Sequence, residues 1–247
     1  MSKVSSMSDA PDFLAAVRGS TDELRRLARS THDTVVADCP GWSGRDVIVH
    51  LGRVYASVAA IIDARASGPV DPGDAALAPA GTAIFDWIDE RCESVLAALG
   101  DIAPDERIWT WSDDRTGAFY HRRMAHETAV HVCDLQRSIA VTVTMDRDLA
   151  CDGIDEAYGI ILPSGLKRRN RSFPSSSLHL HCTDGPGEWM IVPRGDSVDL
   201  RHEHAKGDVA WRGPAVGLLL AAWGRRQTGV VAYGDPNASE EWSSLGI

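Results

Sequence analysis

The sequence lacks any apolar run approaching the roughly 20 residues that a helix needs to cross a bilayer. Its first residues, MSKVSSMSDAPDF, also lack the apolar core of a secretion signal. Basic side chains are few, with 25 Lys and Arg against 35 Asp and Glu, so the formal net charge is -10. Such a charge argues against a protein that coats nucleic acid. We therefore expect a cytoplasmic protein that binds neither membranes nor nucleic acid.

Paired cysteines and two common catalytic motifs are missing as well. The cysteines are scattered and never spaced as C-x-x-C, which predicts free thiols rather than disulfides or a zinc finger; they are Cys39, Cys92, Cys133, Cys151 and Cys182. There is no G-x-S-x-G, which gives no support to Ser-His-Asp hydrolase chemistry. There is also no G-x-x-x-x-G-K-[ST] phosphate-binding loop.

What the first part of the chain does contain is helical periodicity. Apolar residues recur at helical spacing in four segments, at about 11–30, 43–68, 81–99 and 118–139. Ser43 and Asp46 have the spacing of a capping box at the start of the second segment, and Gly68 is expected to close it. Four helices near 20 residues each favour a helical bundle.

The rest of the chain changes character. A connecting helix is expected at about 148–163, followed by a polar linker. Short alternating runs at about 177–184, 187–194, 197–204 and 229–235 predict strands, with an apolar helix at 214–226 before the last of them. The expected fold class is α+β: a bundle domain with its connecting helix at 1–165, and a smaller domain of antiparallel sheet plus helix at 172–247.

The stretch MAHETAVHVCD, which begins at Met124, carries groups that can bind metals. Glu127 and His131 are four residues apart and share one face of a helix, whereas His126 and His131 are five apart and do not. The stretch is therefore not the H-E-x-x-H motif of zinc proteases. The remaining pair is half of a metal site, but such pairs also arise on helices by chance.

A third ligand would have to come from another helix, and His50 is the candidate. It lies in RDVIVHLGRVY, among apolar residues where a solvent-facing histidine would be out of place. A hydrogen-bonded core histidine is the alternative. Together, His50, Glu127 and His131 would form a set that leaves an open position on zinc or a similar divalent ion. Asp134 would either accept a hydrogen bond from an imidazole or, as the pattern favours, be an exposed charge.

Two of these segments resemble the signatures of a known family. PGWSGRDVIVHLGRV and RRMAHETAVHVCDLQ resemble those of the mycothiol-dependent maleylpyruvate isomerase family, whose N-terminal domain is a DinB-like metal-binding four-helix bundle. The segment LHLHCTDGPGEWMI and the later DVAWRGPAVGLLLAAWGRR are similar to its second domain, which is related to sterol-carrier folds. The resemblance covers nearly the whole chain. It implies metal ligation by His50, Glu127 and His131, and it places the arginine of the family's LWGR motif on Arg225, beside Arg226.

The resemblance also implies an activity. We expect an enzyme that depends on a divalent metal, zinc first, and on mycothiol as the thiol cosubstrate. Coordination to the dication would deprotonate the thiol, and the thiolate would add to a small electrophile. If the adduct rotates about the former double bond and then expels the thiol, the enzyme is an isomerase. If the adduct is released instead, the enzyme is an S-transferase. Arg225 would hold a substrate carboxylate, unless it only ends a helix.

Two alternatives and several gaps remain at this point. Metal-bound water in place of thiolate would make the protein a hydrolase, and the second domain would suit a noncatalytic module that binds a small ligand. The sequence names neither the electrophile, the metal nor the oligomeric state. His179 and His181 share one strand face, as do His202 and His204. A second metal site would follow if the two strands were neighbours, but the flanking pattern favours ordinary polar pairs.

Overall fold

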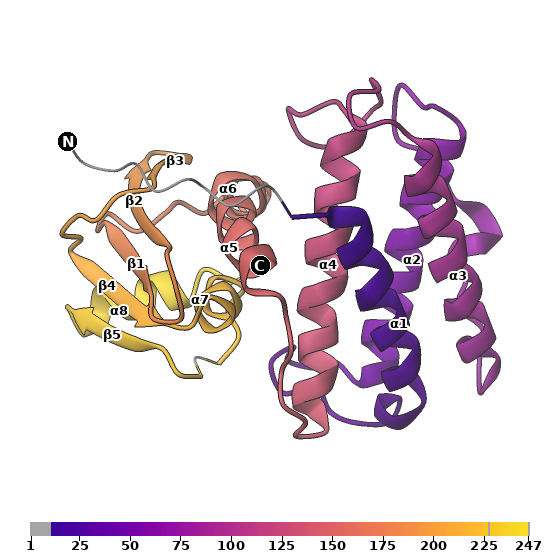
Figure 1. Cartoon of the computed structure of the whole chain (residues 1–247), viewed down its shortest axis with the longest axis horizontal. Helices are drawn as coiled ribbons and strands as arrows, with labels where there is room; N and C mark the ends of the chain where they lie inside the picture. Colours follow the sequence, from indigo (N-terminus) through magenta and orange to yellow (C-terminus); the bar gives the residue numbers. More distant parts are fainter. Residues whose placement is uncertain (1–10, 227, 247) are drawn as a thin grey trace. The chain divides into compact units, whose positions relative to one another are not determined.

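The computed structural model describes residues 11–226 and 228–246, which form two compact units, Pro11–Thr144 and a second that begins at Met145. The first unit is helical, and the second combines a sheet with helices (Figure 1). The expected α+β fold class is confirmed. Within the described residues, no helix combines the length and the apolar character that crossing a bilayer requires.

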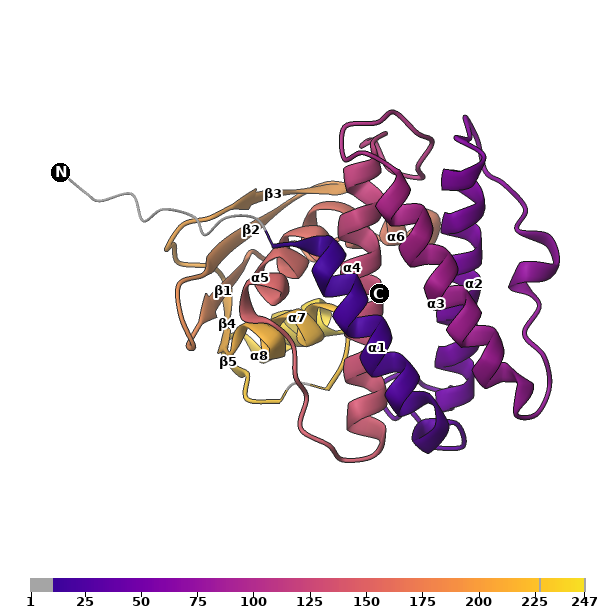
Figure 2. The same cartoon turned by 45° about the vertical axis from the view of Figure 1, so that its right-hand side comes forward.

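The helical unit contains the four predicted helices. They are α1 (Phe13–Thr31), α2 (Gly44–Asp63), α3 (Ala83–Asp101) and α4 (Gly117–Ser138), with a short 3-10 turn η1 (Gly73–Ala76) between α2 and α3. Helix α1 packs mainly on α4, and α2 mainly on α3; Figure 2 shows the four helices from a second side. The core between them is made of the apolar stripes that the periodicity predicted.

Helix α2 begins as predicted and ends earlier. The Ser43 side chain accepts a hydrogen bond from the Asp46 N–H, and the Asp46 carboxylate accepts one from the Ser43 N–H at 2.8 Å, so the capping box is present. Gly68 does not close the helix. The chain turns instead at Arg65, whose φ of 44° is left-handed without glycine, and the Arg65 guanidinium donates to the Ile62 carbonyl at 2.8 Å.

A glycine on α2 lets α3 approach closely. A Cβ atom on Gly52 would lie 2.2 Å from the Trp87 ring of α3, so no side chain fits there. The indole N–H of Trp87 in turn donates to the Ala75 carbonyl at 3.1 Å. This contact fixes α2 against α3 two residues from His50, and it therefore restricts where the His50 imidazole can lie.

The second unit starts with the connecting helix. Helix α5 (Arg147–Glu156), the π-helical turn η2 (Ala157–Ile161) and α6 (Leu162–Arg168) follow one another without a break. The predicted bundle domain, 1–165, included most of this segment. In the structure α5 packs on α7 (Ala215–Ala222) and the segment groups with the sheet, because its apolar side is buried there.

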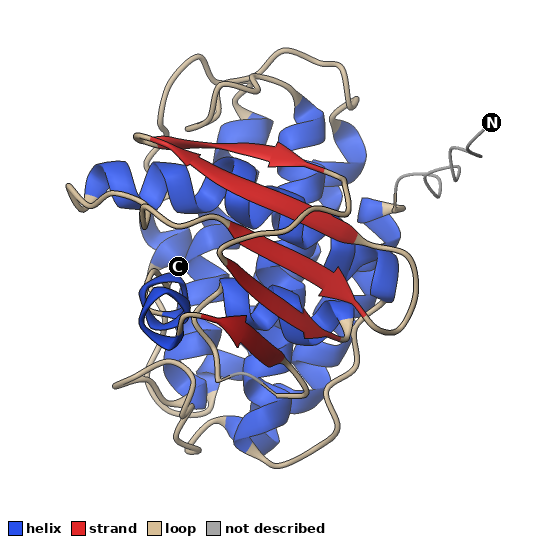
Figure 3. Cartoon of the chain, turned by 90° about the vertical axis from the view of Figure 1, so that its left-hand side faces the viewer, coloured by secondary structure: helices blue, strands red, loops and turns tan. Residues whose placement is uncertain are grey.

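The sheet is mixed rather than antiparallel. Its strands are β1 (Leu178–Cys182), β2 (Glu188–Arg194), β3 (Ser197–Arg201), β4 (Val209–Gly213) and β5 (Val231–Gly234), in the order β3-β2-β1-β4-β5. Figure 3 shows the sheet from its open side, and α8 (Pro236–Ser243) is the last element. The sequence analysis missed β4, which pairs with β1 in parallel. Residues 202–208 carry the chain from β3 to the far side of β1, and this crossover makes the parallel pairing possible.

Candidate metal centre

Helices α2 and α4 bring the three predicted ligands together. His50 Nε2 lies 2.6 Å from Glu127 Oε1, and His131 Nε2 lies 3.6 Å from the same oxygen. One donor atom from each residue lies within 4.8 Å of the others. The arrangement has two causes. One helical turn separates Glu127 from His131 in the sequence, and the packing of the bundle brings α2 against α4.

Trp42 covers the two imidazoles from the segment that precedes α2. Its ring stacks on His131 at 6.0 Å with an interplanar angle of 14°, and it lies 5.2 Å from the ring of His50. The two imidazoles are themselves 4.9 Å apart, edge to face. The indole therefore forms an apolar wall beside the ligand atoms, while the His50 side chain keeps 34% of its surface exposed and gives access to them.

Glu127 is a carboxylate rather than a carboxylic acid in this environment. Burial alone would raise its pKa, but the charge of Arg123 and hydrogen bonds from His131 and His50 outweigh burial and hold the pKa well below its usual value. Arg123 lies one turn before Glu127 on α4 and pairs with Glu127 Oε2. Because Arg123 occupies that oxygen, Oε1 is left facing the two imidazoles.

Asp134 fixes the orientation of His131. Its Oδ2 lies 2.9 Å from His131 Nδ1 and also accepts a hydrogen bond from the Cys39 thiol at 3.4 Å. Asp134 is 1% exposed, so the interpretation of it as an exposed charge is wrong, and the alternative, a partner of the imidazole, holds. Burial opposes the protonation of His131, but its bonds to Asp134 and Glu127 raise its pKa to about 9.

The donor set fits a divalent transition metal. Two imidazoles and one carboxylate are ligands that zinc accepts, and they leave a position for another group. With Nδ1 of His131 turned to Asp134, its Nε2 faces Glu127, as a ligand nitrogen with a fixed tautomer should. Cys39 and Asp134 also form a possible ligand group with His131, but they share that residue and belong to the same centre.

The structure separates the remaining histidine of the stretch from this centre. His126 lies edge to face with Phe13 of α1, at 5.9 Å between ring centroids, as its five-residue offset from His131 implies. Two residues that contact this cluster, Arg123 and Cys39, were not predicted from the sequence. The first was detectable, because an arginine one turn before a glutamate is a helical ion pair. The second gave no signal, because its position depends on the loop before α2.

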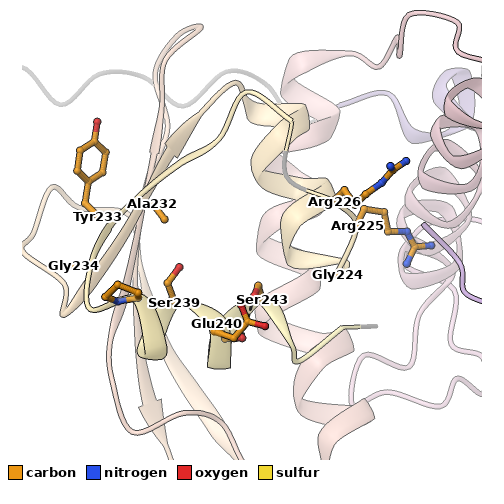
Figure 4. A pocket seen from close by; sticks show the side chains of 10 residues that line it. Gly224, Arg225, Arg226, Ala232, Tyr233, Gly234, Ser239, Glu240 and Ser243 are labelled. Atoms are coloured by element: carbon orange, nitrogen blue, oxygen red, sulfur yellow. Dashed lines mark hydrogen bonds between the residues drawn. The ribbon is translucent and has the colours of Figure 1, made fainter. Parts of the chain in front are cut away.

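Arg225 lies in the second unit, after α7. It is 7% exposed, its Nη1 donates to the Trp223 carbonyl at 2.9 Å, and its guanidinium lies 5.6 Å from the Trp223 ring centroid. A pocket of about 470 Å³ is lined by Arg225, Arg226, Tyr233, Ser239 and Glu240 among others. Figure 4 shows both guanidinium groups pointing away from Tyr233 and Ser239, and none of the three metal-ligand candidates lines this pocket.

Comparison with known proteins places this arrangement in context. Residues 13–136, which hold all three ligand candidates, match the family model described as the mycothiol maleylpyruvate isomerase N-terminal domain. A crystal structure of a mycothiol-dependent maleylpyruvate isomerase is 14% identical, with a TM-score of 0.64, and covers 93% of this chain and 95% of its own. A crystal structure of a variant of such an enzyme, with one histidine changed to alanine, has 13% sequence identity and a TM-score of 0.65, and covers 93% of this chain and 95% of its own. No curated protein sequence matches.

Proposed function

Because the chain belongs to the mycothiol maleylpyruvate isomerase family, we propose that it is an enzyme that uses mycothiol and a divalent cation on a small electrophilic substrate. The cation would be held by His50, Glu127 and His131, with zinc the first choice. The reaction would be an isomerisation or a thiol S-transfer. The observation that carries this proposal is the convergence of two imidazoles and an ionised carboxylate beside Trp42.

The bound cation would supply an open coordination position at which a thiol loses its proton. The protein's own groups prepare that position. Arg123 keeps Glu127 ionised, and Asp134 holds the Nδ1 side of His131, so that Nε2 would face the cation in a fixed direction once its proton is displaced. Trp42 excludes water from one side, which strengthens the attraction between the ligand atoms and a cation.

We propose Arg225 as the residue that binds a carboxylate of the substrate. A guanidinium presents a planar fork that matches a carboxylate, and developing enolate charge would be stabilised by the same group. The cation–π contact with the Trp223 ring and the hydrogen bond to the Trp223 carbonyl hold the guanidinium in one orientation. That support suits a binding group that must be placed accurately.

The neighbouring arginines provide a matched test of this role. Arg225→Lys is expected to lower kcat/KM by about 100-fold, since an ammonium lacks the fork and oxyanion-type contacts are worth that much. Arg226→Lys should change kcat/KM less than about threefold. Steady-state kinetics of both variants at saturating mycothiol would measure this. Equal effects of the two substitutions would contradict the assignment of Arg225.

The affinity for the cation should depend on pH through His131. Its pKa of about 9 means that the imidazole holds a proton at neutral pH that the cation must displace. The affinity should therefore rise about tenfold per pH unit from pH 7 to 8.5 and level off above the pKa. Asp134→Asn removes one cause of the raised pKa, so the levelling should move to lower pH. Competition with a chelator of known pH dependence would measure both curves, and a flat wild-type curve would exclude this linkage.

The reaction class is tested by omitting one component at a time. With maleylpyruvate or a small electrophilic alkene as substrate, we expect turnover only when mycothiol and a divalent cation are both present. Full hydrolytic turnover without thiol would identify a metal-dependent hydrolase instead. Binding of a small ligand that is unaffected by loss of His50, Glu127 and His131 together, with no turnover, would identify a noncatalytic binding module.

A further inference from the structure

Three histidines gather around one carboxylate in the sheet unit. Glu188 Oε1 lies 2.7 Å from His181 Nδ1, and Glu188 Oε2 lies 2.8 Å from His204 Nδ1 and 3.7 Å from His179 Nε2. The ring of His204 is 5.4 Å from that of His179 and 6.3 Å from that of His181. A single carboxylate is thus shared by three imidazoles, with one at Oε1 and two at Oε2.

The topology of the sheet explains why these residues meet. His179 and His181 lie on β1 and point to the same side, and Glu188 on β2 is directly opposite His181 in the antiparallel ladder. His204 comes from the crossover at 202–208, which leads from β3 to β4. The sequence predicted a second metal site only if the two strands with histidine pairs were neighbours. They are not neighbours, since β2 separates β1 from β3. The crossover brings His204 into place instead.

His179 supplies an independent sign that a ligand belongs here. The residue is only 6% exposed, and its Nε2 is buried without a hydrogen-bond partner. A buried polar nitrogen without a partner costs free energy that folded proteins normally avoid. This nitrogen points toward Glu188 Oε2 and lies beyond hydrogen-bond distance at 3.7 Å, as two ligands of a common ion would.

We propose that His179, Glu188 and His204 bind a second divalent transition-metal ion, with zinc as the representative. Their donor atoms lie within 4.8 Å of one another, and ligands on a tetrahedral zinc ion with bonds near 2.0–2.1 Å are about 3.4 Å apart. The distances of 2.8 and 3.7 Å to Glu188 Oε2 bracket that separation. Imidazole ligands favour zinc and its neighbours over magnesium and calcium.

His181 and His202 have different places in this proposal. His181 is a positioning residue, which donates to Glu188 Oε1 and so turns Oε2 toward the other two histidines. His202, although it lies on the same crossover, turns to Asp155, with Nε2 at 3.1 Å from Oδ1, and its ring lies beside that of Trp189. It is therefore outside the ligand set and provides a matched control.

The ion would fasten the crossover to the sheet. The His204 side chain is 79% exposed, so an ion can reach it from solvent, and its Nδ1 is hydrogen-bonded to Glu188 of β2. An ion in place of the shared proton would join His204 to Glu188 on β2 and to His179 on β1 by coordinate bonds. The residues of this site all belong to the sheet unit and none of them is His50, Glu127 or His131, so the inference does not depend on the proposed function.

The test counts bound metal after the first centre is disabled. The full chain carrying His131→Ala is dialysed with Zn²⁺ and its metal content is measured, together with the d–d absorption of its Co²⁺ form. We expect one equivalent to remain. Adding His204→Ala should lower the Zn²⁺ affinity by at least about tenfold and remove the tetrahedral Co²⁺ absorption, because even the partners of metal ligands contribute that much. Adding His202→Ala instead should change neither quantity.

The outcomes separate this proposal from the proposed function. His204 is exposed, so its replacement should not impair folding, and His179→Gln is a second variant expected to lose the same equivalent. Retention of that equivalent in both variants, or its absence from the His131→Ala chain, would overturn the second site. If the wild type bound no more metal than the His131→Ala chain, this result would contradict the metal site in the bundle but not the second site.

Discussion

His131→Ala is expected to lower the affinity of the bundle centre for a divalent cation by more than about 100-fold. Partners of metal ligands alone contribute 10- to 100-fold, and this change would remove a proposed ligand itself. It would also leave the buried carboxylate of Asp134 without the imidazole that it orients. Thiol-dependent turnover should fall to the background rate. Competition with a chelator, combined with an assay of mycothiol-dependent turnover, measures both effects.

The matched control for this variant is His126→Ala. Both histidines are buried on α4, but the ring of His126 contacts Phe13 rather than the ligand cluster. Its replacement should lower the free energy of unfolding and leave the metal affinity within about threefold of the wild type. If the two alanine variants lost metal equally, the loss would follow from damage to the helix, and His131 would not be a ligand.

Arg123→Met is expected to lower the free energy of unfolding by about 3–5 kcal/mol when no cation is present, because it removes one partner of a buried ion pair. Arg123 and Glu127 keep only 5% and 12% of their side-chain surfaces exposed, so water screens little of the loss. Without Arg123 the pKa of Glu127 should rise, since that charge is what chiefly opposes the effect of burial. Urea denaturation at pH 7 in the presence of a chelator measures the change.

A double-mutant cycle separates the ion pair from the packing of the arginine stem. Glu127→Gln added to Arg123→Met should recover part of the lost stability, because the uncompensated buried charge is then gone. The pair also gives a pH signature. The stability that comes from ionised Glu127 is present above its unfolded pKa of about 4.5 and is lost as pH falls through the depressed folded value. Additive losses in the double variant would show that the two residues do not act as a pair.

Much of the bundle could be predicted because local patterns agree with its packing. The capping box of Ser43 and Asp46 needs only three residues of spacing, and the pairing of Glu127 with His131 on α4 needs only one helical turn. His50 was proposed as the third ligand because its imidazole lies among apolar neighbours in the sequence. The structure places this imidazole beside the pair on α4, with Nε2 2.6 Å from Glu127 Oε1.

The features that were not predicted depend on contacts between distant segments. Strand β4 has five residues and leads directly into an apolar helix, so its alternation was too short to detect, and it becomes a strand by pairing with β1. Asp134 is buried beside Cys39, a hydrogen-bond partner 95 positions away in the sequence. The position of His204 beside Glu188 requires the crossover, and a crossover is fixed by strand order rather than by local pattern.

The most direct test is a zinc-loaded crystal of the protein soaked with mycothiol, with the ion located by anomalous scattering. The proposed function predicts an ion bound by His50, Glu127 and His131, with the mycothiol sulfur about 2.3 Å from it. An imidazole of His50 turned away from the ion, or a thiol bound elsewhere in a crystal that still turns over substrate, would contradict it.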